Sequence, residues 1–277
     1  MEHTEGIFRG VRDKKIYYQA YLPKGDIRGS IIIVHGLGEH SGRYDNVVDY
    51  LVPKGFAIYG FDLLGHGKSD GKREFVEKYE DFTETLTNYK NKVKSWQPGK
   101  SLFLLGHSMG GLIATEYLID HSHDFEGAII SAPLITVSDN INKFTIISGK
   151  ILSAIAPTFG ITALDPKAIS RDPKVVNEYI NDPLVYQGKT TARLSVELLK
   201  AIMRVNAEVS RIAVPFIVLQ GSDDRLVNPQ GAKMLHERAG SQDKSIRIYD
   251  GLYHEVFNEP ERDQVLADVA SWLNARV

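Results

Sequence analysis

The segment GHSMG (106–110) places Ser108 in the pattern G-x-S-x-G. An apolar run, SLFLLGH (101–107), precedes the serine and an amphipathic stretch (109–120) follows it, which predicts a turn between a buried strand and a helix. Glycines allow such a turn to be sharp and strained, with close helix–strand contact, so that the hydroxyl is held up into a cleft. Ser108 is therefore a candidate nucleophile for attack on an acyl carbonyl.

A serine hydroxyl needs a base and an orienting acid, which follow such a serine in the chain order acid, then histidine. His254 lies in a loop after the predicted strand 245–250, and it is the one histidine placed late enough after a strand. The acid should follow the predicted strand 215–221, where the sequence GSDDRLVN offers Asp223 and Asp224. Spacing alone does not separate them. One should face His254 while the other caps the turn or the next helix.

Acyl transfer also needs two donors for the oxyanion. The amide of Met109, directly after the candidate nucleophile, is one, and the loop after SIIIVHG (30–36) should supply the other through the amide of Leu37. Gly36 and Gly38 would let this loop approach a substrate closely. The alternative is that the loop is only a glycine-rich turn that caps a helix.

The strands and helices predicted to position these residues alternate along the chain. Two early segments, 5–10 and 14–22, predict a hairpin or meander, since their aromatic and polar residues alternate roughly at period two. Six short apolar runs then suit parallel strands buried on both faces, and they lie at 30–36, 56–62, 101–107, 126–132, 215–221 and 245–250. Amphipathic stretches separate them at 43–53, 78–96, 109–120, 228–239 and 261–275. This order predicts an α/β fold with a mostly parallel, doubly wound sheet.

One segment, 134–213, interrupts this alternation. It shows no clear strand, two helical stretches (141–156 and 190–206) and three Asp-Pro pairs, which we interpret as stops. We expect it to form a helical cap inserted over the carboxyl edge of the sheet, where open α/β sheets bind ligands. Residues 1–133 and 214–277 would then form one core domain.

A row of apolar side chains runs along the first helical stretch of this insertion at helical spacing: Phe144, Ile147, Ile151 and Ile155. Such a row either packs the insertion onto the core or forms a lipid-facing lid that contacts membranes or micelles. Lys150 and Pro157 argue against a spanning helix.

Composition excludes several classes of function. The chain has 277 residues and 43% hydrophobic content, and 33 basic residues oppose 35 acidic ones, so no strong field favours nucleic acid. The absence of cysteine excludes disulfides, thiolate metal sites and a cysteine nucleophile. The polar start MEHTEGIFRG is unlike a signal peptide, so we expect a soluble, cytoplasmic protein.

Several motifs together resemble one known family. The monoacylglycerol lipases of the α/β-hydrolase superfamily are similar over nearly the whole chain, through the segments HGLGEHSGRY, DLLGHGKSDG, FLLGHSMGG, NDPLVY, PFIVLQGSDDRLV and SQDKSIRIYDGLYHEVFNE. GEHSGRY and SQDKSIRIYDGLYH are more specific to this family than the serine motif, which many hydrolases share. The resemblance implies a catalytic triad of Ser108, Asp224 and His254, because the family's acid directly precedes a position like Arg225.

Further roles are implied by the same resemblance. Leu37 and Met109 would provide the oxyanion donors, and Glu39, Arg43 and Tyr179 would hold the glycerol end of a substrate. An ion pair that fixes the oxyanion loop is the alternative for Glu39 and Arg43. Some relatives carry a histidine three residues beyond the catalytic one, where this chain has Phe257. No metal or organic cofactor is required by this chemistry.

The resemblance implies a serine hydrolase that cleaves monoacylglycerols or another single-chain lipid ester. Two alternatives remain: a broader carboxylesterase or lysophospholipase, and a ligand-binding receptor on the same fold with little turnover. An intact triad argues against the receptor. We also expect the cap to touch a membrane surface transiently, and we expect no nucleic-acid partner.

Overall fold

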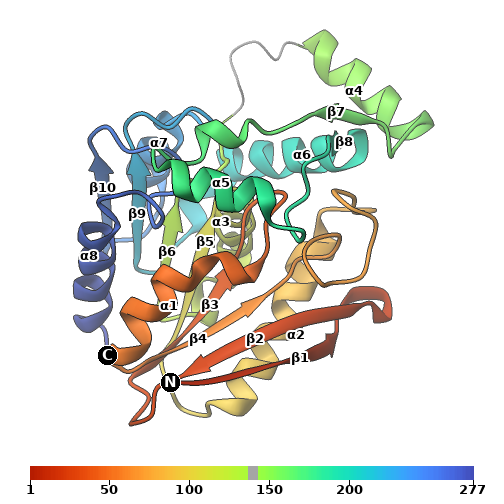
Figure 1. The fold of residues 1–277 in the computed structure, drawn as a ribbon. Coiled ribbons are helices and arrows are strands. Elements are labelled where there is room, and N and C mark those ends of the chain that lie inside the picture. Colours follow the sequence, from red (N-terminus) through yellow and green to blue (C-terminus); the bar gives the residue numbers. More distant parts are fainter. Residues whose placement is uncertain (137–142) are drawn as a thin grey trace.

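A twisted sheet of eight strands lies at the centre of the molecule (Figure 1). The computed structural model describes residues 1–136 and 143–277, and for 143–146 only the backbone. The sheet strands are β1 (Glu2–Arg9), β2 (Lys15–Leu22), β3 (Gly29–Val34), β4 (Phe56–Phe61), β5 (Leu102–His107), β6 (Gly127–Ser131), β9 (Phe216–Gly221) and β10 (Lys244–Tyr249). Their order in space is β1-β2-β4-β3-β5-β6-β9-β10.

The sheet is parallel from β4 to β10 and antiparallel at its first edge. β1 and β2 form a hairpin, and β2 pairs antiparallel with β4. The six apolar runs all form parallel strands, which confirms the predicted doubly wound sheet. The carboxyl ends of these parallel strands meet at one edge, so loops that follow them are brought together.

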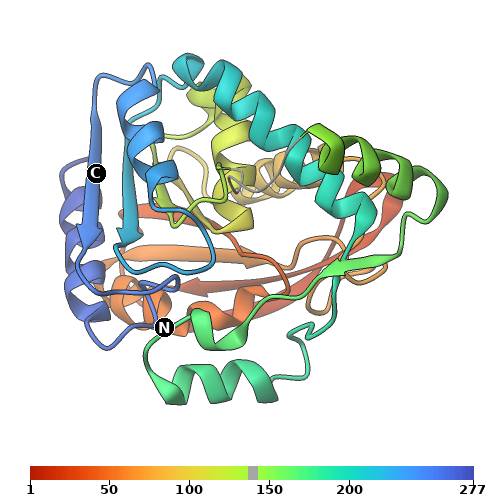
Figure 2. The same ribbon diagram turned by 90° about the horizontal axis from the view of Figure 1, so that it is seen from above.

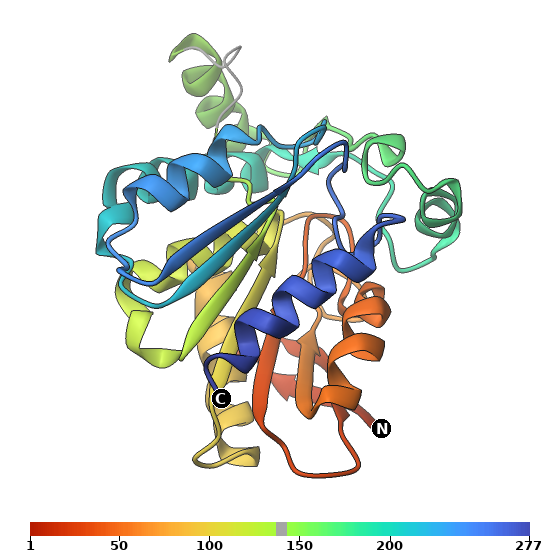
Figure 3. The ribbon, with the colours of Figure 1, turned by 90° about the vertical axis from the view of Figure 1, so that its left-hand side faces the viewer.

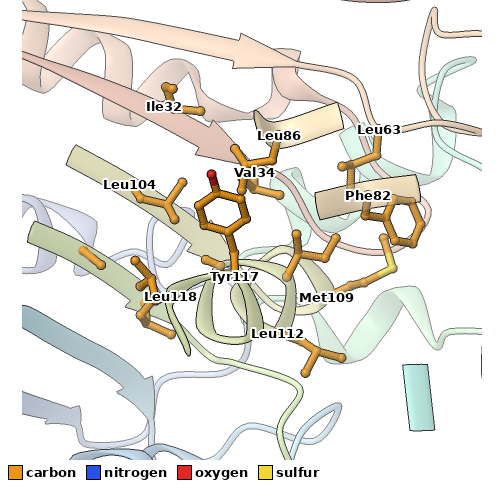
Figure 4. Close-up of a cluster of buried hydrophobic side chains, with 14 of the residues drawn as sticks. Ile32, Val34, Leu63, Phe82, Leu86, Leu104, Met109, Leu112, Tyr117 and Leu118 are labelled. Atoms are coloured by element: carbon orange, nitrogen blue, oxygen red, sulfur yellow. The ribbon is translucent and has the colours of Figure 1, made fainter. Parts of the chain in front are cut away.

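Both faces of the sheet are buried under helices. The helices of the core are α1 (Asp45–Leu51), α2 (Glu80–Trp96), α3 (Met109–His121), α7 (Gln230–Arg238) and α8 (Arg262–Asn274). Alternate residues of each strand serve opposite faces, as in β3, where Ile32 and Val34 pack in the cluster with α2 and α3 while Ile31 and Ile33 pack in the cluster with α1 and α8. Figure 3 shows α8 and α1 crossing one face, and Figure 4 shows side chains of the other cluster.

The insertion carries α4 (Lys143–Ile155), β7 (Gly160–Thr162), α5 (Pro173–Asn181), β8 (Thr190–Thr191) and α6 (Ala192–Glu208), and it lies over the carboxyl edge of the sheet (Figure 1). The expectation that it lacks strands is wrong, since β7 and β8 form a small antiparallel pair. Strands of three and two residues are too short to show a period. Seen from above, α4 lies beside α6 (Figure 2).

The interpretation of every Asp-Pro pair as a stop is also wrong. Asp172 is the N-cap of α5, its carboxylate accepts the amide of Lys174, and Pro173 is the first helical residue. An aspartate followed by proline is a starting signal because proline has no amide to leave unpaired in the first turn. Asp165 and Pro166 begin a short 3₁₀ turn in the same way, whereas Asp182 follows the end of α5.

The last helix of the insertion belongs to the main core. Leu194, Leu198 and Val205 of α6 are buried in the same cluster as α2 and α3. A separate small cluster, made by Ile169, Tyr179 and Val185, holds the region around α5 together. No helix in the described residues has both the length and the apolar content needed to cross a membrane.

Candidate active site

The backbone at Ser108 is strained. Ser108 lies between β5 and α3 with φ 56° and ψ −117°, in the region of positive φ that residues other than glycine rarely adopt. Hydrogen bonds fix this conformation, because the Ser108 amide donates to the Ser131 carbonyl at 2.9 Å and the Ser108 carbonyl accepts from Leu112 at 3.0 Å. Strain of this kind persists when the surroundings over-determine it, and it gathers at functional sites.

The glycines around Ser108 provide space. A Cβ on Gly106 would lie 2.4 Å from the Gly110 carbonyl oxygen, and a Cβ on Gly110 would lie 2.0 Å from the Val34 carbonyl oxygen. Neither glycine has positive φ in this structure. The residue with the strained backbone is therefore the serine itself. The glycines lack a Cβ, which lets β5, α3 and β3 approach one another closely.

Asp224 and His254 form a buried pair. His254 Nδ1 lies 2.7 Å from Asp224 Oδ2, and both side chains are almost completely shielded from solvent. The amides of Leu226 and Val227 donate to Asp224 Oδ1 at 2.9 and 3.0 Å. Burial acts to raise the pKa of Asp224, but the charge of His254 and these hydrogen bonds outweigh it and lower that pKa. The carboxylate is thus held ionised beside the imidazole.

Asp223 has a different environment. It is exposed, and its carboxylate accepts a hydrogen bond from the hydroxyl of its neighbour Ser222 at 2.9 Å. Of the two aspartates that spacing alone leaves open, Asp224 is the one that contacts His254.

Ser108 and His254 line one small cavity at the carboxyl edge of the sheet, together with Gly36, Leu37, Glu39, His107, Leu164, Ile169, Tyr179 and Glu255. Its volume, about 10 Å³, is hardly enough for one water, whereas ligand pockets measure about 300–1,000 Å³. Leu164, Ile169 and Tyr179 of the insertion form part of its wall, and the cavity stays partly open to solvent. A larger hollow of about 590 Å³ lies on the surface near Pro23–Asp26 and Val52–Gly55, and we give it no catalytic role because it contains none of the candidate residues.

The nucleophile and the base share this cavity without a hydrogen bond between them, as far as the described residues show. Catalytic hydrogen bonds are often long before a substrate binds and shorten in the complex. The His254 ring also contacts His107, whose ring centroid lies 4.7 Å away. Burial, together with the charge of His254, lowers the pKa of His107 to about 4. His107 therefore packs as a neutral ring against His254.

The expected oxyanion donors lie at the start of α3 and in the loop after β3. The Met109 side chain points into the core beside Phe82 (Figure 4), so this residue can serve the site only through its backbone. Leu37 lines the cavity, and the amide of its neighbour Gly36 donates to Glu39 Oε1 at 2.6 Å. Within the described part of the chain, the amides of Leu37 and Met109 donate no hydrogen bond.

Glu39 and Arg43 form a buried network behind this loop. Glu39 accepts hydrogen bonds from the Gly36 amide, the Tyr44 hydroxyl and Arg43. Arg43 also binds Glu255 through both terminal nitrogens, at 2.5 and 2.8 Å. The ion pair that fixes the loop is therefore present. Arg43 is fully engaged in it, while Glu39 reaches the cavity as well.

Glu255, which directly follows His254, was not singled out in the sequence. Burial acts to raise its pKa, but the charge and hydrogen bonds of Arg43 lower it to about 2. The Arg43 guanidinium also lies over the Tyr179 ring of α5, 4.6 Å from its centroid. Arg43 thus connects the loop before α1, the His254 loop and the insertion.

A second carboxylate that the sequence did not reveal, Glu259, supports the histidine loop. It accepts hydrogen bonds from the amide of Tyr253 at 3.1 Å and from the amide and Nε of Arg171 at 2.9 and 2.8 Å. The Glu255 amide donates to the Ile169 carbonyl at 2.8 Å. The insertion is therefore anchored on both sides of His254. Only the position of Glu259 in the segment HEVFNEP could have pointed to it.

Phe257 does not face the cavity. Its side chain is buried in the core cluster with α1 and α8. The position at which some relatives carry a histidine therefore contributes packing in this chain.

The apolar row on α4 is exposed. Ile147, Ile151 and Ile155 are 56%, 55% and 76% exposed, while Gly149 and Ser153 on another side of the helix face α6. The interpretation that these three isoleucines pack the insertion onto the core is wrong. Phe144 belongs to the same row, but its side chain lies outside the described residues.

Comparisons with known proteins agree with this geometry. A sequence profile of the family described as serine aminopeptidase, S33, matches residues 25–261. The monoacylglycerol lipase of Mycolicibacterium smegmatis is 34% identical over 98% of this chain and 96% of its own length. The monoglyceride lipase of Homo sapiens is 33% identical over 94% of this chain and 87% of its own length. The crystal structure of the monoacylglycerol lipase from Paleococcus ferrophilus matches with a TM-score of 0.85 and 33% identity, covering 95% of this chain and 99% of the other.

Proposed function

The chain belongs to the serine aminopeptidase, S33, family of α/β-hydrolases, and we propose that it hydrolyses monoacylglycerols to a free fatty acid and glycerol. The observation that carries the proposal is the buried Asp224–His254 pair, whose imidazole lines the same small cavity as the strained Ser108. The family description names a peptidase. Relatives similar over nearly their whole length are lipases of monoacylglycerols, and they favour an ester substrate.

In the proposed mechanism, His254 accepts the Ser108 proton as the hydroxyl oxygen attacks the ester carbonyl. Asp224 holds the imidazole in the tautomer that carries its proton on Nδ1. The amides of Leu37 and Met109 would receive the negative oxygen of the tetrahedral intermediate. When this collapses, the bond to glycerol breaks, His254 protonates the departing oxygen, and the acyl group stays on Ser108. Water then attacks the acyl-enzyme with the same proton transfers and releases the fatty acid.

We further propose that Glu39 and Tyr179 meet the glycerol end of the substrate, since both line the cavity beside Ser108. Arg43 would act on the same end through them, because its guanidinium contacts Glu39 and the Tyr179 ring. Residues 134–213 would form a cap inserted into a core made of residues 1–133 and 214–277, with α6 of the insertion packed into that core. The contribution of Leu164, Ile169 and Tyr179 to the cavity wall supports the role of a cap.

A hydrolysis panel tests the proposal. Mono-, di- and triacylglycerols across acyl lengths, short nitrophenyl esters, a lysophospholipid and an aminoacyl anilide are compared by kcat/KM. We expect a monoacylglycerol to be preferred at least about tenfold over the di- and triacylglycerols, because a cavity narrowed by side chains of the insertion would admit one acyl chain. Equal rates on short esters and long monoacylglycerols would favour the broader esterase. Cleavage of the anilide alone would favour a peptidase, and no turnover at all would favour a receptor.

We also propose that the exposed face of α4 touches lipid surfaces from which the substrate is taken. Three exposed isoleucines spaced by four residues form one stripe, and Phe159 and Ile161, also exposed, follow directly after the helix. Exposed apolar patches of this kind mark interaction sites, and an apolar helix face can lie in the boundary region of a bilayer.

Replacing Ile147, Ile151 and Ile155 together with serine is expected to weaken association with phosphatidylcholine vesicles at least about tenfold, because apolar area no longer leaves water on binding. Hydrolysis of a soluble nitrophenyl ester should be unchanged. Co-sedimentation with vesicles measures the first effect. Ile7→Ser removes an isoleucine of similar exposure, 61%, from the far edge of the sheet and is the matched control. Association that survives the triple change refutes the proposed contact.

A further inference from the structure

The buried carboxyl of Glu74 has no role in the mechanism above. Glu74 lies in the loop between β4 and α2, with φ 53° and an almost fully buried side chain. Its Oε2 finds no hydrogen-bond partner in the described residues, and the same is true there of His66 Nε2 and Arg73 Nη1. Three such atoms in one short loop, together with a strained backbone, are unusual, since buried polar groups are normally paired.

Glu74 lies directly behind the loop that carries Leu37. A Cβ placed on Gly38, which has φ 73°, would lie 3.3 Å from Glu74 Oε1, 3.3 Å from the Tyr186 carbonyl oxygen and 3.5 Å from the Tyr179 hydroxyl. Tyr186 also donates its amide to the Gly38 carbonyl at 2.8 Å. The carboxyl is therefore at the place where the insertion meets the loop beside the nucleophile.

Glu74 lies close to the His66 ring but makes no hydrogen bond with it. His66 Nδ1 lies 3.1 Å from the Leu64 carbonyl oxygen, which assigns a proton to Nδ1 and leaves Nε2 with a lone pair. Glu74 Oε1 lies 3.7 Å from that Nε2. Burial lowers the pKa of His66 to about 3, and burial raises the pKa of Glu74 to about 7, although the neighbouring Thr190 side chain acts to lower it. Below neutral pH Glu74 is therefore protonated.

Of the other titratable groups around Glu74 and His66, Arg73 carries a charge near pH 7. His35, whose ring centroid lies 5.3 Å from that of His66, has its pKa lowered to about 4 by burial, and Tyr179 of α5 has its pKa raised by burial, so both stay neutral. Arg73 is the neighbouring cation, and its Nη2 donates to the Gly67 carbonyl at 2.7 Å. Thr191 of β8 donates its hydroxyl to the Glu74 carbonyl oxygen, which ties the residue to the insertion.

We propose that Glu74 is a positioning residue that supports the Gly38 loop while it is protonated, and that its ionisation slows turnover. An unpaired negative charge behind this loop opposes the anion that the Leu37 amide is proposed to receive, and it disturbs the contact between the loop and the insertion. This inference rests on the proposed function, because it assigns the pH response of that same site.

The test is the pH dependence of kcat for a soluble nitrophenyl ester between pH 5 and 10. For the unmodified chain we expect kcat to fall at least about threefold between pH 7 and pH 9. Glu74→Gln keeps the shape of the protonated acid and should abolish the alkaline fall. Glu77→Gln removes the same charge from an exposed residue of the same loop and should leave the fall unchanged. An alkaline fall that persists in Glu74→Gln overturns the proposal.

Thermal unfolding gives a readout independent of turnover. Because the pKa of Glu74 is higher in the folded chain than in the unfolded one, its ionisation lowers stability as pH rises from about 4.3 to about 7. Glu74→Gln should therefore match the unmodified chain at pH 5 and melt a few degrees higher at pH 8.

If Glu74→Gln does not fold, carboxyl ¹³C NMR of the unmodified chain replaces it. One glutamate is expected to titrate near pH 7, and the absence of any carboxyl that titrates there overturns the inference. Both physical readouts remain decisive even if the chain hydrolyses none of the esters, so failure of this inference and failure of the proposed function are distinguishable.

Discussion

Ser108→Ala is expected to lower kcat for ester hydrolysis by about 10⁵–10⁶-fold, because no other group on the described cavity wall can attack the ester carbonyl in its place. The base and the acid act together with Ser108 as one unit, so they do not compensate for its loss. Remaining turnover should come only from substrate binding and the oxyanion donors. Stopped assays with a nitrophenyl ester and a monoacylglycerol measure the loss. An active-site phosphonate probe should label the unmodified chain and leave the variant unlabelled.

Ser108→Gly is the matched variant. Glycine adopts φ 56° without the steric cost that serine pays, so this variant should be equally inactive and about 1 kcal/mol more stable than the unmodified chain. The combination of lost activity and gained stability identifies a strained functional residue. Turnover within about tenfold of the unmodified chain in both variants would remove Ser108 from the mechanism.

Asp224→Asn is expected to lower kcat by about 10³–10⁴-fold with little change in the fold. Asparagine keeps an oxygen for the amides of Leu226 and Val227, but it presents an amide or a neutral oxygen to His254 Nδ1. The imidazole then loses the carboxylate that orients it and stabilises its protonated form. Steady-state kinetics on a soluble ester measure the effect.

Asp223→Asn supplies the control for this change. The two aspartates are neighbours and carry the same charge, but Asp223 is exposed and contacts only the Ser222 hydroxyl among the described side chains. We expect its kcat to stay within about threefold of the unmodified chain, as for most surface substitutions. The reverse order of the two effects would transfer the role of the acid to Asp223.

The fold of the core was predictable because its signals are strong and local. Runs such as SIIIVHG hold four consecutive apolar residues, a pattern typical of a strand with both faces buried. The insertion was predicted less well. α5 has nine residues and begins at an Asp-Pro pair, which is a start in this position and a stop in others. β7 and β8 are set by their pairing with each other, which sequence periodicity does not contain.

The site was predictable where chain order restricts it. The order of serine, acid and histidine singles out His254, but Asp223 and Asp224 are equivalent by spacing, and only the family resemblance preferred Asp224. Residues that support the site are much harder to find. Glu255 and Glu259 act through Arg43 and Arg171, from segments far away in the chain. Glu74 stands out only when burial and its missing partners are known.

Because α6 is part of the main core, only part of the insertion can be exchanged without disturbing the core. Leu194, Leu198 and Val205 pack against the same cluster as α2 and α3, so removing α6 would open the interior. A graft from another hydrolase should therefore exchange the chain between Leu134 and Thr190 and retain everything from Thr191 onward. The exchanged part should keep Ile169, Arg171 and Tyr179, because they contact the His254 loop and Arg43, whereas from Thr191 onward a change of sequence also alters the packing of the core.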